Sequence, residues 1–321
     1  MKNSYLNIFS FNKKNLNKTI KLLNKGEIVG LPTETVYGLA GNAYDKLAVK
    51  KIFNAKKRPK YNPLIVHYNS IKNISKDVKT NLFFMKLYKR LCPGPITFIL
   101  KKKKNSKVNN QVTANLKTIA VRFPKHKIVR SILRSIDYPL AMPSANISSS
   151  ISPVTAIDVY EEFKNKIKLI FDGGKSKIGI ESTVIDLTNE PKILRPGFIS
   201  SSKIEKILKI KFKKKIKEKK IKSPGMLKRH YSPGIPIKIN QIKPDYKSAY
   251  IYLGKRFKNR KGFFSLSKNS NLNEAASNLY RTFRIIKKKG FKKIQIASIP
   301  YKGSGVAIND RIKRASSKKW N

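Results

Sequence analysis

The sequence contains a single cysteine, Cys92, and only three histidines among 321 residues. One cysteine cannot form a disulfide within the chain, and it cannot build a cysteine-based zinc or iron–sulfur site. No apolar run approaches the ~20 residues that span a bilayer, and the first residues lack a small-residue cleavage site. These absences predict a cytoplasmic protein with no membrane segment, no signal peptide and no metal site made from protein motifs.

Acidic residues are also scarce: 17 Asp and Glu face 72 Lys and Arg, so the formal net charge is +55. With 40% hydrophobic and 10% aromatic residues, the chain still has enough apolar material for a core. An excess of this sign is typical of nucleic-acid binders. Most of it is Lys, however, whereas base and phosphate readers favour Arg. Compositional drift on the surface and a selected polyanion surface both remain open.

Short apolar runs alternate with helical patterns in the first two hundred residues, which predicts an α/β fold. The expected strands are 27–32, 63–68, 96–100, 118–123, 169–172, 182–187 and 192–195. We expect helices ending before Gly26, opening at Asp45 and covering about 80–91. Consecutive strands without a helix over 182–195 imply a mixed sheet.

The alternation stops around 205–236, where a lysine-rich stretch leads into SPGMLKRHYSPG, and it resumes at 237. Strands are expected at 248–254, 262–267 and 293–300, with an apolar-faced helix near 272–288 and a closing helix. The sequence therefore predicts a catalytic or binding domain over 1–208, a linker over 209–236, and a smaller, parallel α/β domain over 237–321.

The familiar nucleotide-binding loops are absent, since neither G-x-x-x-x-G-K-[ST] nor a strand followed by G-x-G-x-x-G occurs. Polar residues gather instead where predicted strands end: at 32–38, at His67, at Arg122 and at 143–146. Open α/β sheets place their sites at such ends. We therefore expect these segments to meet in one site.

Each of these residues also has a purely structural interpretation. Lys56 and Arg58 could bind an anion, or could complement the dipole at a helix C-terminus. Ser144 and Asn146 could bind a ligand or form a turn. A partly buried Arg122 needs an anionic partner, which could be a substrate carboxylate, a phosphate or a structural Asp or Glu.

Seven segments in register make one family resemblance: 31–40 (LPTETVYGLA), 55–68 (AKKRPKYNPLIVHY), 93–100 (PGPITFIL), 118–124 (TIAVRFP), 143–148 (PSANIS), 181–186 (ESTVID) and 194–197 (LRPG). In this the chain resembles the YrdC-like threonylcarbamoyl-adenylate synthases. The linker and the final GSGVAINDRIKRAS resemble the second half of their long, two-domain form. The resemblance implies a twisted mixed α/β sheet with a concave, positively charged face, followed by a Rossmann-like domain.

The activity that the resemblance implies joins L-threonine, bicarbonate and ATP into threonylcarbamoyl-AMP and releases pyrophosphate. The product feeds formation of N6-threonylcarbamoyladenosine at position 37 of tRNAs that read codons beginning with A. Mg²⁺ would come with the ATP phosphates. Downstream tRNA threonylcarbamoyl transferase proteins would be partners, and weak binding of RNA or tRNA would be compatible with the charge.

The resemblance also implies roles for individual residues. The catalytic set would be Lys56, Arg58, Ser144 and Asn146. ATP would be held by Arg58, Asn62, Thr118, Ser144, Ser152, Arg195 and Tyr231, the last as part of a lid formed by the linker. Threonine would be held by Thr35, His67, Arg122 and Ser182. The glycine usual in the family after PSANIS is Ser149 here.

Two alternatives come from other functional classes. One is a non-catalytic module that binds double-stranded RNA or tRNA on the same basic face. The other is a carbamoyltransferase of the hydrogenase-maturation type, which embeds a similar domain but normally carries cysteine zinc motifs. The complete set of Lys56, Arg58, Ser144 and Asn146 favours the synthase over the first, and the single cysteine argues against the second.

Overall fold

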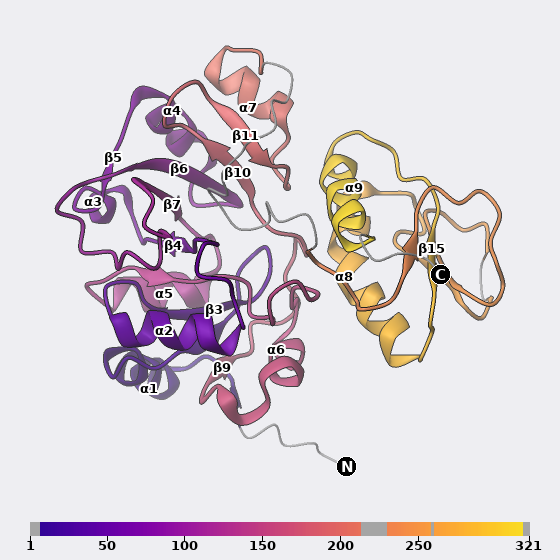
Figure 1. The fold of residues 1–321 in the computed structure, drawn as a ribbon, viewed down its shortest axis with the longest axis horizontal. Helices are drawn as coiled ribbons and strands as arrows, with labels where there is room; N and C mark the ends of the chain where they lie inside the picture. Colours follow the sequence, from indigo (N-terminus) through magenta and orange to yellow (C-terminus); the bar gives the residue numbers. More distant parts are fainter. Residues whose placement is uncertain (1–6, 213–229, 258–259, 317–321) are drawn as a thin grey trace.

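The computed structural model describes residues 7–212, 230–257 and 260–316, which form an N-terminal and a C-terminal part (Figure 1). The strands of the N-terminal part are β1 (Ile8–Phe9), β2 (Val29–Leu31), β3 (Gly38–Asn42), β4 (Ile65–His67), β5 (Val78–Lys79), β6 (Ile96–Lys102), β7 (Thr118–Arg122), β8 (Leu140–Ala141), β9 (Ile170–Phe171), β10 (Thr183–Asp186) and β11 (Lys192–Arg195). Its helices are α1 (Lys13–Asn24), α2 (Lys46–Ala55), α3 (Ile71–Ile74), α4 (Leu82–Leu91), α5 (Lys127–Arg134), α6 (Ala156–Phe163), the 3₁₀ turn η1 (Lys164–Lys166) and α7 (Ser201–Leu208).

Within the described residues these strands form one 11-stranded mixed sheet in the order β1-β9-β2-β3-β8-β4-β7-β6-β10-β11, with β5 on β6. The pair β10 and β11 is antiparallel and β10 runs parallel to β6, as expected for strands without an intervening helix. No strand is predicted directly after the polar segment at 32–38, but β3 starts at Gly38 and returns antiparallel to β2. Residues 32–37 therefore lie in a hairpin turn at the sheet's end.

The local sequence explains the helix that positions two site residues. Asp45 caps α2 by accepting hydrogen bonds from the Leu47 and Ala48 amides, as its place before the apolar pattern predicts. Ala48 and Ile52 are buried against the sheet. The helix ends at Ala55, so Lys56 and Arg58 follow directly from its C-terminus.

The C-terminal part contains β12 (Ile237–Lys238), β13 (Ala249–Tyr252), β14 (Phe263–Ser265), α8 (Leu272–Lys288), β15 (Ile294–Ile296) and α9 (Ser304–Ala315). Its strands pair in the order β12-β15-β13-β14, every pair parallel, as predicted for the smaller domain. Figure 1 shows α8 and α9 on the side of this sheet that faces the N-terminal part. No helix among the described residues is long and apolar enough to cross a bilayer.

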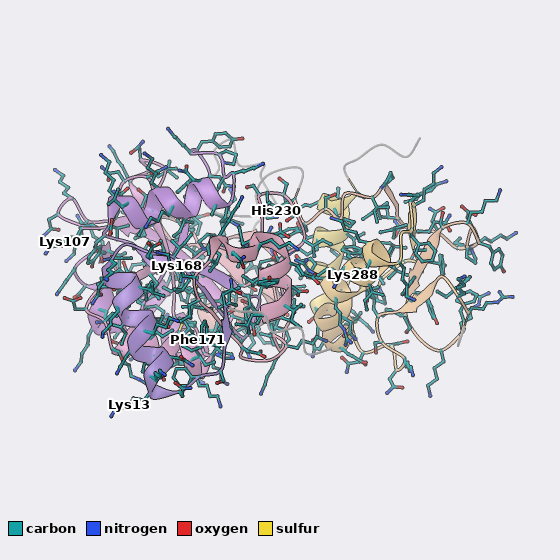
Figure 2. The ribbon with its side chains drawn as sticks, turned by 90° about the horizontal axis from the view of Figure 1, so that it is seen from below. Lys13, Lys107, Lys168, Phe171, His230 and Lys288 are labelled. Carbon is teal, nitrogen blue, oxygen red and sulfur yellow. The ribbon has the colours of Figure 1, made fainter. Side chains whose placement is uncertain are left out.

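One hydrophobic cluster joins the two parts. Val36, Ile151, Val154 and Ile180 of the N-terminal part pack with the apolar residues of α8, α9 and the second sheet. Figure 2 shows His230 between the two parts, while Lys13 and Lys107 project outward from the N-terminal part. The C-terminal part is therefore packed against the N-terminal part, close to the ends of its strands.

Candidate active site

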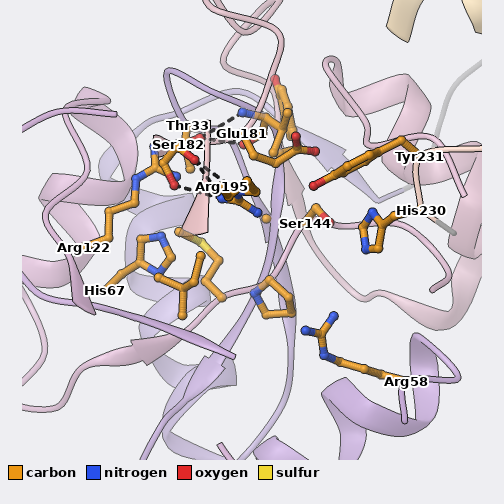
Figure 3. Close-up of a pocket in the computed structure, with 16 residues that line it drawn as sticks. Thr33, Arg58, His67, Arg122, Ser144, Glu181, Ser182, Arg195, His230 and Tyr231 are labelled. Atoms are coloured by element: carbon orange, nitrogen blue, oxygen red, sulfur yellow. Dashed lines mark hydrogen bonds between the residues drawn. The ribbon is translucent and has the colours of Figure 1, made fainter. Parts of the chain in front are cut away.

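A pocket of about 500 Å³, including its solvent-filled mouth, lies where the predicted polar segments meet (Figure 3). The lining residues are Thr33, Val36, Tyr37, Gly38, Arg58, Ile65, His67, Arg122, Met142, Pro143, Ser144, Glu181, Ser182, Arg195, His230 and Tyr231. The strand ends, the segment after α2 and the start of the C-terminal part all contribute to it.

Seven of the residues predicted to form the site line this pocket: Arg58, His67, Arg122, Ser144, Ser182, Arg195 and Tyr231. Lys56, Asn62, Asn146, Ser152 and Thr35 lie behind it and contact lining residues or their immediate neighbours. Thr118 stands apart, because it begins β7 while Arg122 ends it, a separation of roughly 13 Å along a strand. The pocket thus gathers most of the predicted set.

Lys56 is 1% exposed and fastens the loop that carries Ser144 and Asn146. Its Nζ donates to the Ser144 carbonyl at 2.5 Å and also to the Asn146 carbonyl. Burial lowers the pKa of Lys56 well below its usual value, and the nearby Arg58 cation acts in the same direction. The two hydrogen bonds from Nζ therefore hold the 144–146 backbone in place.

Arg58 is fixed by the residues that follow it. Its Nε donates to the Asn62 carbonyl at 2.9 Å, and its Nη2 donates to Asn62 Oδ1 at 2.6 Å and to the Pro63 carbonyl at 2.8 Å. Burial lowers the pKa of Arg58 to about 9, so the guanidinium stays protonated at neutral pH. It is a desolvated cation held in one orientation at the pocket wall.

Glu34 is an anionic partner of Arg122 that the sequence left unidentified. Arg122 Nη2 donates to Glu34 Oε1 at 2.6 Å, and both side chains are buried. Burial would raise the pKa of Glu34, but the Arg122 guanidinium and hydrogen bonds outweigh it and lower this pKa. Arg122 Nε remains without a hydrogen-bond partner among the described residues. Arg122 therefore keeps a buried donor for a second acceptor.

His67 lies beside Arg122 and is neutral. Burial, followed in size by the charge of Arg122, lowers the pKa of His67 well below its usual value. Its backbone pairs with Arg122 on β7 and with Leu140 on β8, and its Nδ1 has no partner among the described residues. A neutral imidazole next to a cation can accept or donate a hydrogen bond without adding charge.

Glu181 lines the pocket and is also absent from the predicted set. It accepts from Ser152 Oγ at 2.6 Å, from the Tyr280 hydroxyl at 3.0 Å and from Arg311 Nε at 2.8 Å. Burial would raise the pKa of Glu181, but Arg311 and Arg195 lower it to about 2. The signal available in the sequence was the carboxylate at the start of the ESTVID motif. Its partners Tyr280 and Arg311, however, lie 99 and 130 residues away.

Arg195 and Ser182 come from neighbouring antiparallel strands. Arg195 donates from Nε to the Ser182 carbonyl at 3.1 Å and from Nη2 to Ser182 Oγ at 3.1 Å. Ser182 Oγ also lies 2.8 Å from Thr97 Oγ1. The strand pairing of β10 with β11 thus places this cation beside the hydroxyl.

Buried polar atoms without a partner among the described residues concentrate at this site: Asn62 Nδ2, His67 Nδ1, Arg122 Nε, Asn146 Oδ1, His230 Nδ1 and Tyr231 Oη. Buried polar groups in folded proteins are normally hydrogen-bonded. Together with the cations, the cluster suits a polar, anionic ligand. Among the described residues no group of three or more His, Cys, Asp or Glu could hold a metal ion.

Two segments beside the pocket carry unusual backbone conformations. Ser149 has φ +72°, and Tyr231 has φ +64°, both in the left-handed region that favours glycine. Ser149, where the resemblance leads us to expect a glycine, therefore adopts a conformation that glycine adopts more readily. Of the linker predicted over 209–236, residues 213–229 lie outside the described residues, while Tyr231 is fully buried.

Comparison with known proteins identifies similar chains over nearly the whole length. A family model described as "Telomere recombination" matches residues 21–197, and one described as "Threonylcarbamoyl-AMP synthase, C-terminal domain" matches 199–317. The threonylcarbamoyl-AMP synthase of Pyrococcus abyssi is 36% identical over 317 residues, covering 92% of each chain. That of Bacillus subtilis is 34% identical over 333 residues, covering 96% of this chain and 94% of its own.

Among solved structures, the crystal structure of P. abyssi Sua5 complexed with L-threonine superposes with a TM-score of 0.87. It is 34% identical and covers 96% of this chain and 97% of its own. This likeness confirms the predicted fold class, with a large mixed-sheet part followed by a smaller α/β part. The predicted divisions at 208 and 236 and the individual site roles stay predictions.

Proposed function

Because the chain belongs to the two-domain threonylcarbamoyl-AMP synthase family, we propose that it makes threonylcarbamoyl-AMP from L-threonine, bicarbonate and ATP. Pyrophosphate is the second product. The reaction is the first step in forming N6-threonylcarbamoyladenosine at position 37 of tRNAs that read codons beginning with A. The observation that carries this proposal is the pocket itself, which joins three fixed cations, Arg58, Arg122 and Arg195, to buried donors without partners.

Threonine fits the end of the pocket formed by His67 and Arg122. The unpartnered Nε of Arg122 suits a carboxylate oxygen, while Glu34 fixes the guanidinium from the other side. Neutral His67 and the Ser182 hydroxyl line the same wall. Thr35 supports it from behind, because its Oγ1 lies 2.9 Å from the Oγ1 of the lining Thr33.

ATP fits the end formed by Arg58 and Ser144. In the reaction, the threonine amine forms a bond to the carbon of bicarbonate, and the loss of water from that carbon gives a carbamate. A carbamate oxygen then attacks the α-phosphorus, and the bond to pyrophosphate breaks. Charge develops on the α-phosphate during attack, and fixed cations and donors stabilise it without reorganisation. Arg58 and Arg195 supply the positive charge that stabilises the phosphate. Lys56 holds the loop of Ser144 and Asn146 in place.

The remaining residues predicted to hold ATP have different roles, some through neighbouring side chains and some by direct contact. Asn62 fixes Arg58 and keeps its Nδ2 without a partner among the described residues. Ser152 donates to Glu181 and so orients a lining carboxylate. Tyr231 would cover the nucleotide and exclude water from the labile mixed anhydride. Thr118 would require the nucleotide to extend along β7.

Mg²⁺, bicarbonate and the cellular setting also belong to this proposal. Neither Glu34 nor Glu181 offers a free carboxylate for a metal, because Arg122 and Arg311 engage them. Mg²⁺ would therefore accompany the ATP phosphates. A reactive product implies transfer proteins that carry the threonylcarbamoyl group to tRNA, and we propose a cytoplasmic location for these steps.

The decisive assay follows pyrophosphate release from ATP while each substrate is omitted in turn. We expect release only when both L-threonine and bicarbonate are present, together with a product of the mass of threonylcarbamoyl-AMP. Serine replaces threonine as the matched control. Turnover indifferent to threonine would contradict the proposal and favour a plain ATPase, whereas no turnover at all would favour a non-catalytic module.

A second proposal, weak binding of RNA or tRNA, has one specific observation in its favour. The C-terminal part carries exposed arginines stacked on rings: Arg260 lies 5.2 Å from the Tyr246 ring and Arg256 lies 5.3 Å from the Phe257 ring. Tyr246 is 67% exposed. Aromatic rings with arginine suit unpaired bases and their phosphates. This surface adds to the synthase activity rather than replacing it.

A further inference from the structure

We propose that Arg311, on α9 of the C-terminal part, is a positioning residue that holds Tyr231 against the nucleotide end of the pocket. The inference rests on the proposed function for its kinetic consequence, but its structural basis stands separately. Arg311 is fully buried and lies outside the pocket lining. It would therefore act through Tyr231 and Glu181, which do line the pocket.

Two side chains of the C-terminal part contact the ring of Tyr231. The Arg311 guanidinium carbon lies 5.1 Å from the ring centroid, which is cation–π distance. On α8, the Tyr280 ring stacks on it at 5.8 Å with an interplanar angle of 29°. All three side chains are fully buried. These two contacts restrict the rotation and the position of the ring.

The Tyr231 backbone is fastened from both parts of the molecule. The amide before it, of His230, donates to the Arg314 carbonyl at 3.2 Å on α9. The amide after it, of Ser232, donates to the Ser149 carbonyl at 2.9 Å in the N-terminal part. Between these bonds Tyr231 adopts φ +64°, a conformation that costs a non-glycine residue energy and persists only when its surroundings enforce it.

Arg311 also ties together the segments that bear other lining residues. Its Nε donates to Glu181 at 2.8 Å, and its Nη1 donates to the Pro196 carbonyl at 2.8 Å. Glu181 precedes Ser182, and Pro196 follows Arg195. One guanidinium thus sets the relative positions of two strand ends and the Tyr231 ring.

The orientation of Tyr231 gives this arrangement a catalytic consequence. Its hydroxyl is buried, has no partner among the described residues and points into the pocket on the side of Glu181 and Ser144 (Figure 3). A displaced ring would withdraw that donor and open the nucleotide end to water. Of the residues proposed to hold threonine, His67 and Arg122 make no contact with Arg311 among the described interactions, and Ser182 is linked to it only through its neighbour Glu181.

The test is a double-mutant cycle of Arg311→Met and Tyr231→Ala. We expect Arg311→Met to raise the KM for ATP about tenfold, as loss of a desolvated cation–π contact predicts, and to change the KM for threonine less than about twofold. In the Tyr231→Ala background, Arg311→Met should change the KM for ATP by less than about threefold, because the ring that Arg311 positions is absent. If Arg311→Met fails to fold, Arg311→Lys enters the cycle, since it keeps a cation beside Glu181 but loses the planar stack.

Arg284→Met is the matched control. Arg284 also bridges the two parts, donating to the Ile151 carbonyl at 2.8 Å from α8, but it makes no contact with Tyr231 among the described interactions. An equal rise in the KM for ATP in this control, or additive effects in the cycle, would overturn the inference and assign Arg311 to domain docking alone.

Hydrogen exchange at the Ser232 amide gives a readout that needs no turnover. Arg311→Met should speed this exchange about tenfold, and Arg284→Met should leave it within about twofold. An unchanged Ser232 amide in Arg311→Met would contradict the positioning role even if the enzyme were active. Absence of threonine-dependent turnover in the wild type would instead remove the proposed function and leave the exchange result to decide the inference.

Discussion

Lys56 and Arg58 are both buried, but they have different roles at the site. Lys56 donates two hydrogen bonds to carbonyls and lies behind the pocket, whereas Arg58 lines it. Taking a cation out of water is costly, and the carbonyl bonds offset part of that cost. Because Arg58 is already desolvated, a phosphate oxygen could bind it without first displacing water from the guanidinium. The two residues of one motif therefore have distinct tasks: one shapes the loop and one meets the nucleotide.

Substitution of these cations should separate the tasks. We expect Arg58→Ala to lower threonine-dependent pyrophosphate release at least about a hundredfold, because it removes a fixed charge from the reacting phosphate. Lys56→Ala should cause a similar loss by releasing the Ser144 loop, and circular dichroism should show both variants folded. Lys60→Ala, an exposed neighbour, is the control. Wild-type rates in both variants would remove the proposed phosphate site.

Site residues whose hydrogen-bond partners lie close in the sequence could be predicted. Partners that lie far away in the sequence could not. Arg58 finds Asn62 and Pro63 within five positions, so its motif reads as a unit. For Arg122, the sequence showed that an anion was needed. It did not single out Glu34, which lies 88 residues away. Partner choice at such separations depends on sheet order, which no local pattern encodes.

At the scale of elements, the long periodic segments matched their predictions, whereas the short strands and the connections were not predicted. The predicted helix near 272–288 coincides with α8 (Leu272–Lys288), because its apolar face is regular over five turns. β8 has only two residues and leaves no periodic signal, yet it joins β3 to β4. The segment at 230–232 reads as part of a linker from its Pro and Gly residues. Its burial comes from α8, α9 and the Ser149 turn together.

The burial of His230 makes that segment sensitive to acid. Burial lowers the pKa of His230 to about 3; Arg58, Lys56 and Arg195 also oppose protonation, and Glu181 favours it. Since the folded-state pKa lies below the ordinary value of about 6.5, the unfolded chain takes up the proton first as pH falls. The stability that neutral His230 contributes is therefore complete above about pH 6.5 and is lost progressively toward pH 3.

We predict that the free energy of unfolding of the wild type falls about 2 kcal/mol more than that of His230→Gln between pH 7.5 and pH 5. Urea titrations at each pH measure the difference. His67 and His126 also have lowered pKa values, but both are present in the two proteins and cancel in the comparison. Parallel pH profiles would show that His230 is solvated in solution.

At the scale of the whole molecule, burial sorts the cations that carry chemistry from the rest of the +55 charge. Among the described residues Lys56 is the one buried lysine, while the arginines Arg58, Arg122, Arg195 and Arg311 are all buried. Each of these five has hydrogen-bond partners within the site or behind it. Figure 2 shows lysines such as Lys13 and Lys107 projecting outward. Surface lysines therefore need no role in the reaction.

Arg256 and Arg260 test whether any of the surface charge is selected. Both are exposed and lie on aromatic rings, and Arg260 Nη1 also donates to the Tyr246 hydroxyl at 3.0 Å. We predict that Arg256→Ala with Arg260→Ala weakens binding of an unmodified tRNA transcript about tenfold and reduces the salt dependence by about two phosphate contacts. Replacing Lys13 and Lys14, which are exposed on α1, by alanine removes the same charge and should weaken tRNA binding less than about twofold.

Fluorescence anisotropy over a salt series measures both quantities. Diffuse attraction depends on net charge alone, so it predicts equal losses for the two double variants. A local stacking surface instead predicts that the loss follows position and that arginine-to-lysine exchange restores only the charge-dependent part. Equal losses would therefore assign all tRNA affinity to the lysine-rich composition and leave the cations of the pocket as the ones with a specific role.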